Sequence, residues 1–245
     1  MPLTEREKTR YDRQIMIFGE DGQERLKNAY VAVVGVGGLG SPIALYLTAA
    51  GIGRLLLIDY QKPELSNLNR QVLHWEPDID AEKSKAISAK EKLQKLNPDI
   101  DIRTFTEKLT PENIDTVLKG VDIVVDALDN YEVRYLINEF CVRNRIPFIH
   151  GAVEGLIGQV TTIIPGETPC LKCLVPSAPK KAEKFPILGV TAGVVGLLEA
   201  SEVIKLLTGY GDLLKGKILL VDLHTDDFQK ITIHKNPECP VCGKI

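Results

Sequence analysis

Closely spaced glycines separate two apolar segments at Gly35-Val-Gly-Gly-Leu-Gly40. A G-x-G-x-x-G turn between a strand and a helix lets the backbone fold tightly and presents helix N-terminal N–H groups to an anionic phosphate. Asp59 ends the next apolar run, where a ribose hydroxyl would need an acceptor. The pattern predicts a nucleotide site, with a glycine turn that only packs a helix on a strand as the alternative. The glycines concerned are Gly35, Gly37, Gly38 and Gly40.

A polar segment, Glu64-Leu-Ser-Asn-Leu-Asn-Arg-Gln71, follows shortly after Asp59. It lies beyond the carboxyl end of a predicted strand, where open α/β sheets place their ligand contacts. A dehydrogenase would account for the glycine turn but not for this segment. Three cations, Arg13, Arg70 and Lys85, could instead meet a triphosphate, although isolated surface charges are the simpler interpretation of each.

Four of the five cysteines form two C-x-x-C pairs, Cys170-Leu-Lys-Cys173 and Cys239-Pro-Val-Cys242. Two such knuckles supply the four thiolates of a closed, tetrahedral zinc site, and Gly243 eases the second turn. Without an open coordination position for water, the zinc is expected to be structural. Two redox-active C-x-x-C motifs are the alternative, but neither opens a helix in a thioredoxin-like unit.

The fifth cysteine, Cys141, lies in an apolar helical pattern and is expected to be a buried small hydrophobe. The segment from Leu174 to Gly189 contains no cysteine. No thiol is therefore left for thioester chemistry on the enzyme.

Taken together, these motifs resemble a known family. Arg10-Tyr-Asp-Arg-Gln-Ile15, the glycine turn, Ser66-Asn-Leu-Asn-Arg-Gln71 and the two cysteine pairs are similar to the MoeB/ThiF/HesA adenylyltransferases, bacterial and archaeal relatives of ubiquitin-activating enzymes. The resemblance extends from about Thr9 to Cys242, in the family's motif order. The Ser66–Gln71 block is much more specific than the glycine turn.

The resemblance implies adenylation of the C-terminal Gly-Gly carboxylate of a small ubiquitin-like sulfur-carrier protein, with Mg-ATP as co-substrate and pyrophosphate as product. It also implies a homodimer and an external sulfur donor, in molybdopterin, thiamine or tRNA thiolation. By position, Asp59 would hold the ribose, and Asp129 would hold magnesium unless it only caps the next helix. The residues implied around the phosphates are Asn67, Arg70 and Lys85, with Arg13 reaching in from the partner subunit.

Some positions leave the assignment open. Lys83 competes with Lys85 for the phosphate contact, and Gln61 and Pro63 depart from the family's usual pattern at the ribose and adenine edge. Two other functions remain: adenylation of a different substrate, or a catalytically silent nucleotide-binding partner that docks carrier proteins. Retention of Arg13, Arg70 and the other charged positions argues against the silent partner.

The elements that must position these residues alternate between strand and helix. Expected strands are Tyr30–Val34, Leu55–Asp59, Ile102–Phe105, Val121–Ala127 and Pro147–His150. Expected helices are Ser41–Ala50, Glu82–Leu96, Pro111–Leu118 with Thr110 as cap, and Glu132–Arg145. This alternation predicts a parallel sheet covered on both faces.

After Gly151 the pattern changes to antiparallel strands at Gly158–Ile164, Lys217–Asp222 and Gln229–His234. A long helix, Val190–Leu207, is expected to carry Glu199, Glu202 and Lys205 on its polar side. The predicted fold is a Rossmann-like, mostly parallel sheet with helices on both faces, continued by antiparallel strands with a four-cysteine zinc site. We expect one domain over residues 1–245, nucleotide-binding to about 150 and antiparallel and zinc-binding beyond.

Composition excludes several classes of protein. Thirty Lys and Arg against 33 Asp and Glu give a net charge of -3, without the basic excess typical of direct nucleic-acid binding. The uncharged stretch from Ala29 to Gly53 contains a glycine turn and a proline, so we expect a buried strand and helix and no membrane span. The charged N-terminus lacks the apolar core of a signal peptide, and we therefore expect a cytoplasmic protein.

Overall fold

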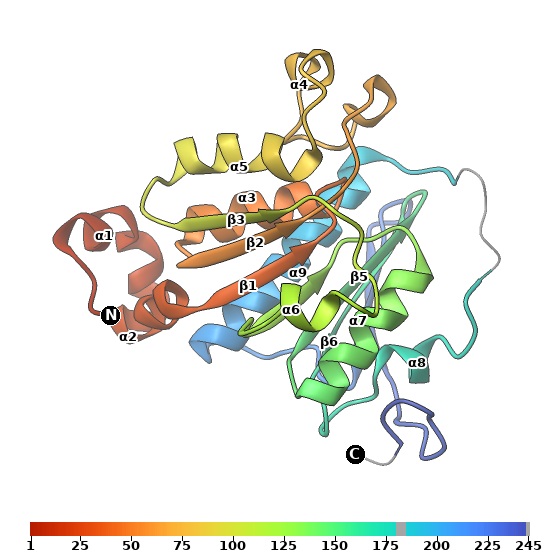
Figure 1. Cartoon of the computed structure of the whole chain (residues 1–245). Coiled ribbons are helices and arrows are strands. Elements are labelled where there is room, and N and C mark those ends of the chain that lie inside the picture. Colours follow the sequence, from red (N-terminus) through yellow and green to blue (C-terminus); the bar gives the residue numbers. More distant parts are fainter. Residues whose placement is uncertain (180–184, 244–245) are drawn as a thin grey trace.

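One mixed sheet runs through the part of the chain that the computed structural model describes, residues 1–179 and 185–243 (Figure 1). The strand order is β3-β2-β1-β4-β5-β6-β7-β8, with the first five strands parallel and the last three joined antiparallel. This confirms the predicted parallel sheet with an antiparallel continuation. The strands are β1 (Tyr30–Val34), β2 (Arg54–Ile58), β3 (Asp101–Phe105), β4 (Ile123–Asp126), β5 (Phe148–Glu154), β6 (Ile157–Ile163), β7 (Lys217–Asp222) and β8 (Asp227–Thr232).

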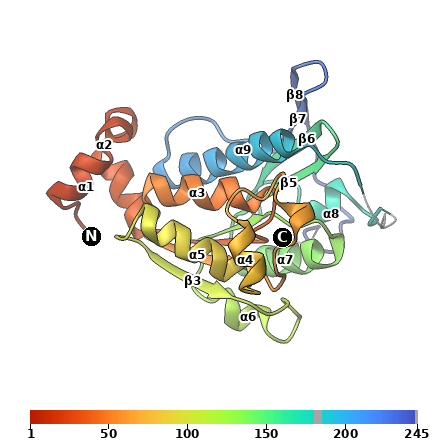
Figure 2. The same ribbon diagram turned by 90° about the horizontal axis from the view of Figure 1, so that it is seen from above.

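Helices cover both faces of the sheet. On one face α3 and α9 pack together, with α5 and α2 beside them, and on the other face lie α6, α7 and α8 (Figure 2). The helices are α1 (Glu5–Arg10), α2 (Asp12–Asn28), α3 (Gly40–Ala50), α4 (Glu76–Asp80), α5 (Lys85–Leu96), α6 (Ile114–Val117), α7 (Tyr131–Asn144), α8 (Leu171–Leu174) and α9 (Gly189–Thr208), with a 3-10 turn η1 (Leu65–Asn67).

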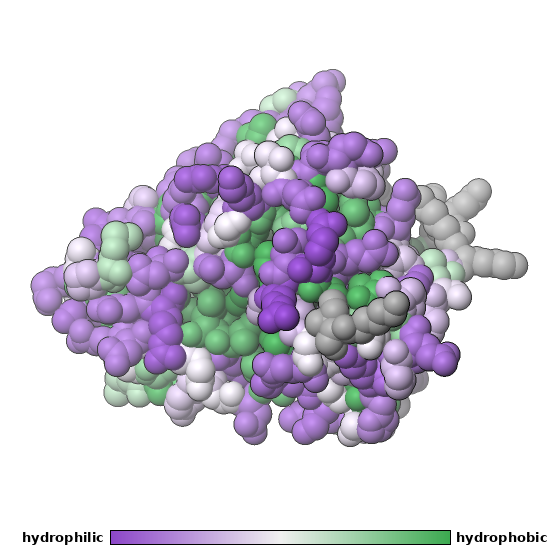
Figure 3. Space-filling view, turned by 60° about the horizontal axis from the view of Figure 1, so that its bottom comes forward, coloured by the Kyte–Doolittle hydropathy of each residue, from purple (hydrophilic) through white to green (hydrophobic). Residues whose placement is uncertain are grey.

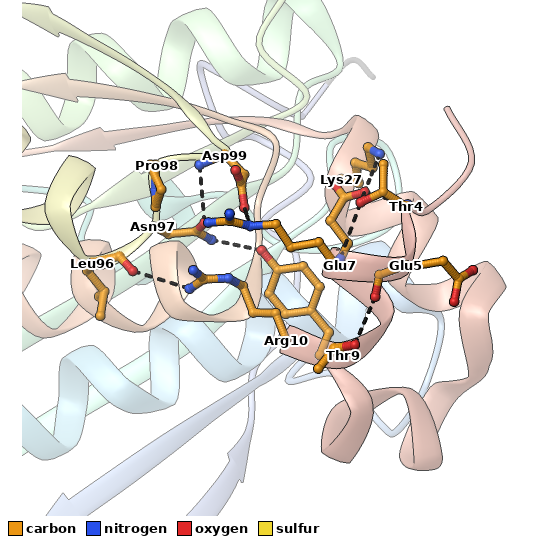
Figure 4. Close-up of polar contacts among 12 residues, drawn as sticks. Thr4, Glu5, Glu7, Thr9, Arg10, Lys27, Leu96, Asn97, Pro98 and Asp99 are labelled. Carbon is orange, nitrogen blue, oxygen red and sulfur yellow. Dashed lines mark hydrogen bonds and ion pairs between the residues drawn. The ribbon is translucent and has the colours of Figure 1, made fainter.

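The two N-terminal helices, which the sequence patterns did not predict, are fastened to the rest of the fold by side chains. Arg10 donates to the carbonyl oxygen of Leu96 at 3.2 Å, and the buried amide of Asn97 donates to the hydroxyl of Tyr11 at 2.8 Å (Figure 4). The Tyr11 ring lies over Gly51, where a Cβ atom would come within 2.4 Å of it. The helices are thus held against the end of α5 and the end of α3.

Two predicted helices begin later than expected. Helix α5 starts at Lys85 because Ser84 occupies the N-cap and its hydroxyl accepts from the N–H of Ile87, while Glu82 has a positive φ of 51°. Helix α6 starts at Ile114, so Thr110 is not its cap.

The prediction that Glu199 and Glu202 lie on a polar side of α9 is wrong, because that side of α9 packs on β5 and β6. Glu202 is buried, but it accepts from the backbone N–H of Leu214 at 2.8 Å and pairs with Lys205. Glu199 lies against Gly151, and neither of its oxygens has a hydrogen-bond partner among the described residues. Burial raises the pKa of Glu199 well above its usual value, with a further contribution from Asp126.

The surface in Figure 3 is mostly hydrophilic, with apolar patches between the charged side chains. Within the described ranges, none of the helices has the length and apolar character needed to cross a membrane.

Candidate nucleotide site and metal site

The predicted site residues follow the carboxyl ends of three adjacent strands. Val34 at the end of β1 is in register with Ile58 on β2 and with Asp126 on β4. The glycine turn, Asp59 and the segment that carries Asp129 therefore leave the sheet at one edge.

The glycine turn needs glycine at specific positions. Gly35 has a φ of 92°, a conformation that residues with a side chain rarely adopt. At Gly40, the first residue of α3, a Cβ atom would lie 2.0 Å from the carbonyl oxygen of Gly35. At Gly38, a Cβ atom would lie 3.2 Å from Ala192 of α9. The turn thus brings α3, β1 and the start of α9 into close contact and leaves its backbone accessible beside Arg70, whose side chain lies near Gly38.

Asp59 is half-buried and fixes the turn directly. Its two oxygens accept the N–H groups of Val36 and Gln61, both at 2.9 Å. Burial raises the pKa of Asp59, opposed by these hydrogen bonds and by the charge of Lys85. Since a carboxylate can accept about four hydrogen bonds, capacity for ribose hydroxyls remains.

Lys85, and not Lys83, lies with the other charged residues of this edge. The Lys85 ammonium donates to the side-chain oxygen of Gln61 at 2.8 Å, and its charge interacts with Asp59 and Asp129. Burial lowers the pKa of Lys85. Lys83 instead pairs with Glu91 on the surface at 2.6 Å.

The Ser66–Gln71 segment lies between the glycine turn and α9. Arg70 donates to the carbonyl oxygen of Ser66 at 2.9 Å and to the side chain of Asn69, while Asn67 accepts the N–H of Glu64. Gln71 was not singled out from sequence, yet it is buried, its Oε1 has no partner among the described residues, and its amide nitrogen lies next to Gly37. An orphaned amide oxygen beside the turn fits a site that receives a polar ligand.

The two aspartates that follow β4 have different surroundings. Asp129 is exposed, and Asn130, not Asp129, is the N-cap of α7, since its side chain accepts the N–H of Val133. Asp126 is fully buried. It is bound by Arg134 at 3.0 Å and by His150 at 2.6 Å, so it supports the loop from within.

Arg13 lies on α2, which is beside the start of β1 in Figure 1, whereas the glycine turn follows the end of β1. Its side chain is 91% exposed, and the acidic group nearest to it is Asp12 at 3.9 Å. Neighbouring motif residues are anchored: the side-chain amide of Gln14 donates to the carbonyl oxygen of Ala50 at 2.7 Å. The structure thus separates Arg13 from the other predicted site residues of its own chain.

The two cysteine pairs, although far apart in sequence, come together at α8, which contains Cys173 and has Cys170 as its N-cap. All four sulfur atoms lie within 4.8 Å of one another, with Cys170 to Cys239 at 3.7 Å and Cys173 to Cys242 at 3.4 Å. Tetrahedral zinc with Zn–S bonds of about 2.3 Å would place its sulfurs about 3.8 Å apart. The cluster could hold a metal of this kind, and it fastens the C-terminal knuckle to α8.

Two further observations fit the metal interpretation. The N–H of Asn236 points at the sulfur of Cys173 at 3.5 Å, as is usual around metal-bound thiolates. At Gly243 a Cβ atom would lie 2.5 Å from the carbonyl oxygen of Pro237, so the second knuckle requires glycine. Cys141 is separate from this cluster and fully buried, as predicted, and burial raises the pKa of its thiol.

The sheet and the glycine turn define a Rossmann-like fold continued by antiparallel strands, with a four-cysteine cluster that could hold a metal. A family model described as the ThiF family matches residues 11–241, and the chain belongs to this family. The membership confirms the resemblance on which the expectation of an adenylyltransferase depended.

Individual relatives are similar over nearly the whole chain. The heterocyst HesA protein of Trichormus variabilis is 43% identical over 98% of this chain and 91% of the relative. The sulfur carrier protein adenylyltransferase of Thermus thermophilus is 42% identical over 99% of this chain and 93% of that protein. These similarities confirm the predicted enzyme class, adenylyltransferase.

Solved structures show the same fold. The crystal structure of E. coli MccB with ATP superimposes with a TM-score of 0.84 at 27% identity, covering 96% of this chain and 74% of MccB. MccB with N-formylated MccA superimposes with a TM-score of 0.86.

Proposed function

We propose that this protein adenylates the C-terminal Gly-Gly carboxylate of a small ubiquitin-like sulfur-carrier protein. A tail carboxylate oxygen attacks the α-phosphorus of ATP, the bond to the β-phosphate breaks, and pyrophosphate leaves with the bonding electron pair. The observation that carries the proposal is the placement of Asp59, Lys85, Arg70 and Asp129 around the glycine turn at one edge of the sheet. The name of the Thermus thermophilus relative supports the carrier as substrate.

Each group has a defined task in this reaction. Asp59 binds the ribose, and the N–H groups of the turn with Asn67, Arg70 and Lys85 bind the phosphates. Asp129 would hold Mg²⁺, which supplies further positive charge at the phosphates. Attack of one anion on another requires fixed positive charge, and Arg70 and Lys85 provide it without reorganisation.

The decisive experiment is pyrophosphate–ATP exchange with purified carriers that end in Gly-Gly. Exchange should require the carrier and should disappear when its two terminal glycines are deleted. Exchange with a short peptide but with no carrier would instead indicate adenylation of another substrate. Binding of ATP without exchange under any condition would indicate a catalytically silent docking protein.

Asp129→Asn should lower carrier-dependent exchange by at least about a hundredfold, since it removes the charge that holds the metal. Glu132→Gln, a change of equal charge at an exposed position of α7, is the matched control and should leave exchange unchanged. Equal loss in both variants would contradict a specific role of Asp129.

The proposed enzyme is a homodimer in which Arg13 serves the partner's nucleotide site. Arg13 is solvent-exposed and distant from its own site, yet it lies on a helix whose neighbouring residues are anchored. Next to it, α2, α3 and α9 form an apolar groove that a second copy would cover. The groove is lined by residues that include Ile17, Phe18, Tyr46, Leu197 and Tyr210.

Mixing two inactive variants tests this arrangement. Arg13→Ala and Arg70→Ala should each lose exchange, but a mixture should recover about one quarter of the activity, because half of the dimers then contain one intact site. No recovery in a mixture that exchanges subunits would contradict action across the interface.

The reaction is proposed to end at the acyl-adenylate, which an external sulfur donor or persulfide then attacks. Cys141 is buried and its pKa is raised, so it is a poor nucleophile. Cys141→Ser should therefore keep full exchange activity. A thioester between a carrier and Cys141 under non-reducing conditions would contradict this endpoint.

The cysteine cluster is proposed to bind one structural Zn²⁺ through Cys170, Cys173, Cys239 and Cys242. Metal analysis should give about one zinc per chain, and chelation should unfold the C-terminal knuckle. A fully folded protein without metal would contradict the assignment. On this basis, residues 1–245 act as one adenylyltransferase domain.

A further inference from the structure

A buried histidine lies directly beneath the glycine turn. His74 is 2% exposed and is located between the turn and α5. Its Nε2 lies 2.7 Å from the carbonyl oxygen of Val36, and its Nδ1 lies 2.9 Å from the hydroxyl of Ser88. A carbonyl oxygen can only accept, so Nε2 carries the proton and donates it to Val36.

The surroundings of the ring fix this protonation state. Burial lowers the pKa of His74 to about 4, so the ring is neutral at neutral pH and has one donor and one acceptor. The Ser88 hydroxyl accepts from the ammonium of Lys92 at 2.9 Å and can therefore donate its proton to Nδ1. Lys92 is in turn paired with Asp78 at 2.5 Å.

Both polar groups of Val36 are held by side chains. The N–H of Val36 donates to Asp59 at 2.9 Å, and its carbonyl oxygen accepts from His74. The residues on either side, Gly35 and Gly37, are glycines with little conformational restraint of their own. The conformation of the turn therefore depends on contacts from outside it.

Ser88 connects the same histidine to the helix that begins at Lys85. Ser88 is three positions after Lys85, so the two side chains are neighbours on one face of α5. A side chain bonded to both Val36 and Ser88 sets the distance between the turn and the start of α5.

We propose that His74 is a positioning residue, which holds the glycine turn and the Lys85 end of α5 in the arrangement that binds the phosphates of ATP. This inference rests on the proposed function for its ligand. His74 itself touches no substrate, so its loss should weaken ATP binding more than it slows the chemical step.

Three variants separate this role from a general structural one. His74→Phe fills the space without a donor, and His74→Gln places an amide donor near the position of Nε2. Ser88→Ala keeps the bond from Nε2 to Val36 and removes the hydroxyl that contacts Nδ1 and Lys92. ATP affinity is measured by titration calorimetry without any carrier, and the KM for ATP and kcat are measured by pyrophosphate exchange. Urea unfolding shows that each variant is folded.

His74→Phe should weaken ATP binding and raise the KM for ATP about tenfold, with a change in kcat below about threefold. His74→Gln should recover most of the affinity, and Ser88→Ala should give an intermediate loss. Wild-type affinity in folded His74→Phe would overturn the inference. If that variant does not fold, equal affinities in wild type and Ser88→Ala would overturn it.

The outcome is distinct from that of the proposed function. Wild-type protein that binds ATP but never exchanges pyrophosphate would reject the adenylation reaction, while the calorimetric comparison would still decide the role of His74.

Discussion

Two loops at the same edge of the sheet are each supported by a buried histidine, but in different ways. Under the glycine turn, His74 makes hydrogen bonds to a carbonyl group and to a hydroxyl group. Under the loop that carries Asp129, His150 binds Asp126, which is also paired with Arg134. The ring of His74 is hydrogen-bonded to uncharged groups, whereas the support that includes His150 contains the buried ion pair of Asp126 and Arg134.

The difference follows from what each loop must hold. Arg134 donates to the carbonyl oxygens of Leu128 and Gly151, so one cation fastens the loop to β5. Burial raises the pKa of Asp126, but Arg134 and His150 outweigh this effect and keep the pKa below its usual value. The loop that presents a carboxylate is thus supported by a compensated charge, whereas His74 supports the turn proposed to receive phosphate through hydrogen bonds of a neutral ring.

The largest expected effect is at the ion pair. Arg134→Met should lower the free energy of unfolding by about 3–5 kcal/mol, because it leaves Asp126 buried without its counter-charge. Arg143→Met is the control, since Arg143 pairs with Asp115 on the surface and its loss should cost about 1 kcal/mol or less. Urea unfolding monitored by circular dichroism measures both. Similar losses in the two variants would remove the distinction drawn between buried and exposed pairs.

A second prediction concerns the buried carboxyl group of Glu199, which has no hydrogen-bond partner in the described part of the chain and interacts with Asp126. Its folded-state pKa is raised, so folding binds a proton at Glu199, and the stability present below pH 4.5 is lost as the pH rises through the folded pKa. The loss is about 1.4 kcal/mol for each unit of pH between these two values. Glu199→Gln does not titrate at this position.

The melting temperature of Glu199→Gln should therefore rise relative to that of the wild type as the pH is raised above 4.5. Glu139→Gln, at an exposed position of α7, should follow the wild type. A difference between Glu199→Gln and wild type that does not vary with pH would show that Glu199 does not bind a proton on folding.

The smallest effect is expected at the neutral support. Ser88→Ala should cost about 1 kcal/mol of stability, since it removes the hydroxyl that joins His74 to Lys92 but leaves the bond to Val36. A loss as large as that of Arg134→Met, measured under the same conditions, would show that the two supports do not differ in kind.

Sequence patterns located what depends on short-range order. The apolar runs predicted β1 and β2, and the residue after β2, Asp59, lies where the strand order requires. The two C-x-x-C spacings predicted the cysteine cluster for the same reason, because each knuckle is a local turn.

Contacts between distant segments were not predictable in this way. His74 lies 38 positions from Val36, and Glu199 was assigned to a polar face because its neighbours on the helix give no sign that β5 and β6 cover it. The N-terminal helices were missed because their sequence is rich in charge, and α2 is interrupted at Gly19, where φ is 74°. In each case the deciding partner is supplied by the tertiary fold.

Asn97 also links three segments of the chain through its side-chain hydrogen bonds. Its amide donates both to Tyr11 and to the carbonyl oxygen of Thr48, so α1, the end of α3 and the end of α5 share one buried hydrogen-bonding centre. The N-terminal helix cannot detach without leaving that centre unsatisfied. Backbone amides in these three segments, although far apart in sequence, should therefore exchange their hydrogens with solvent as a single cooperative unit.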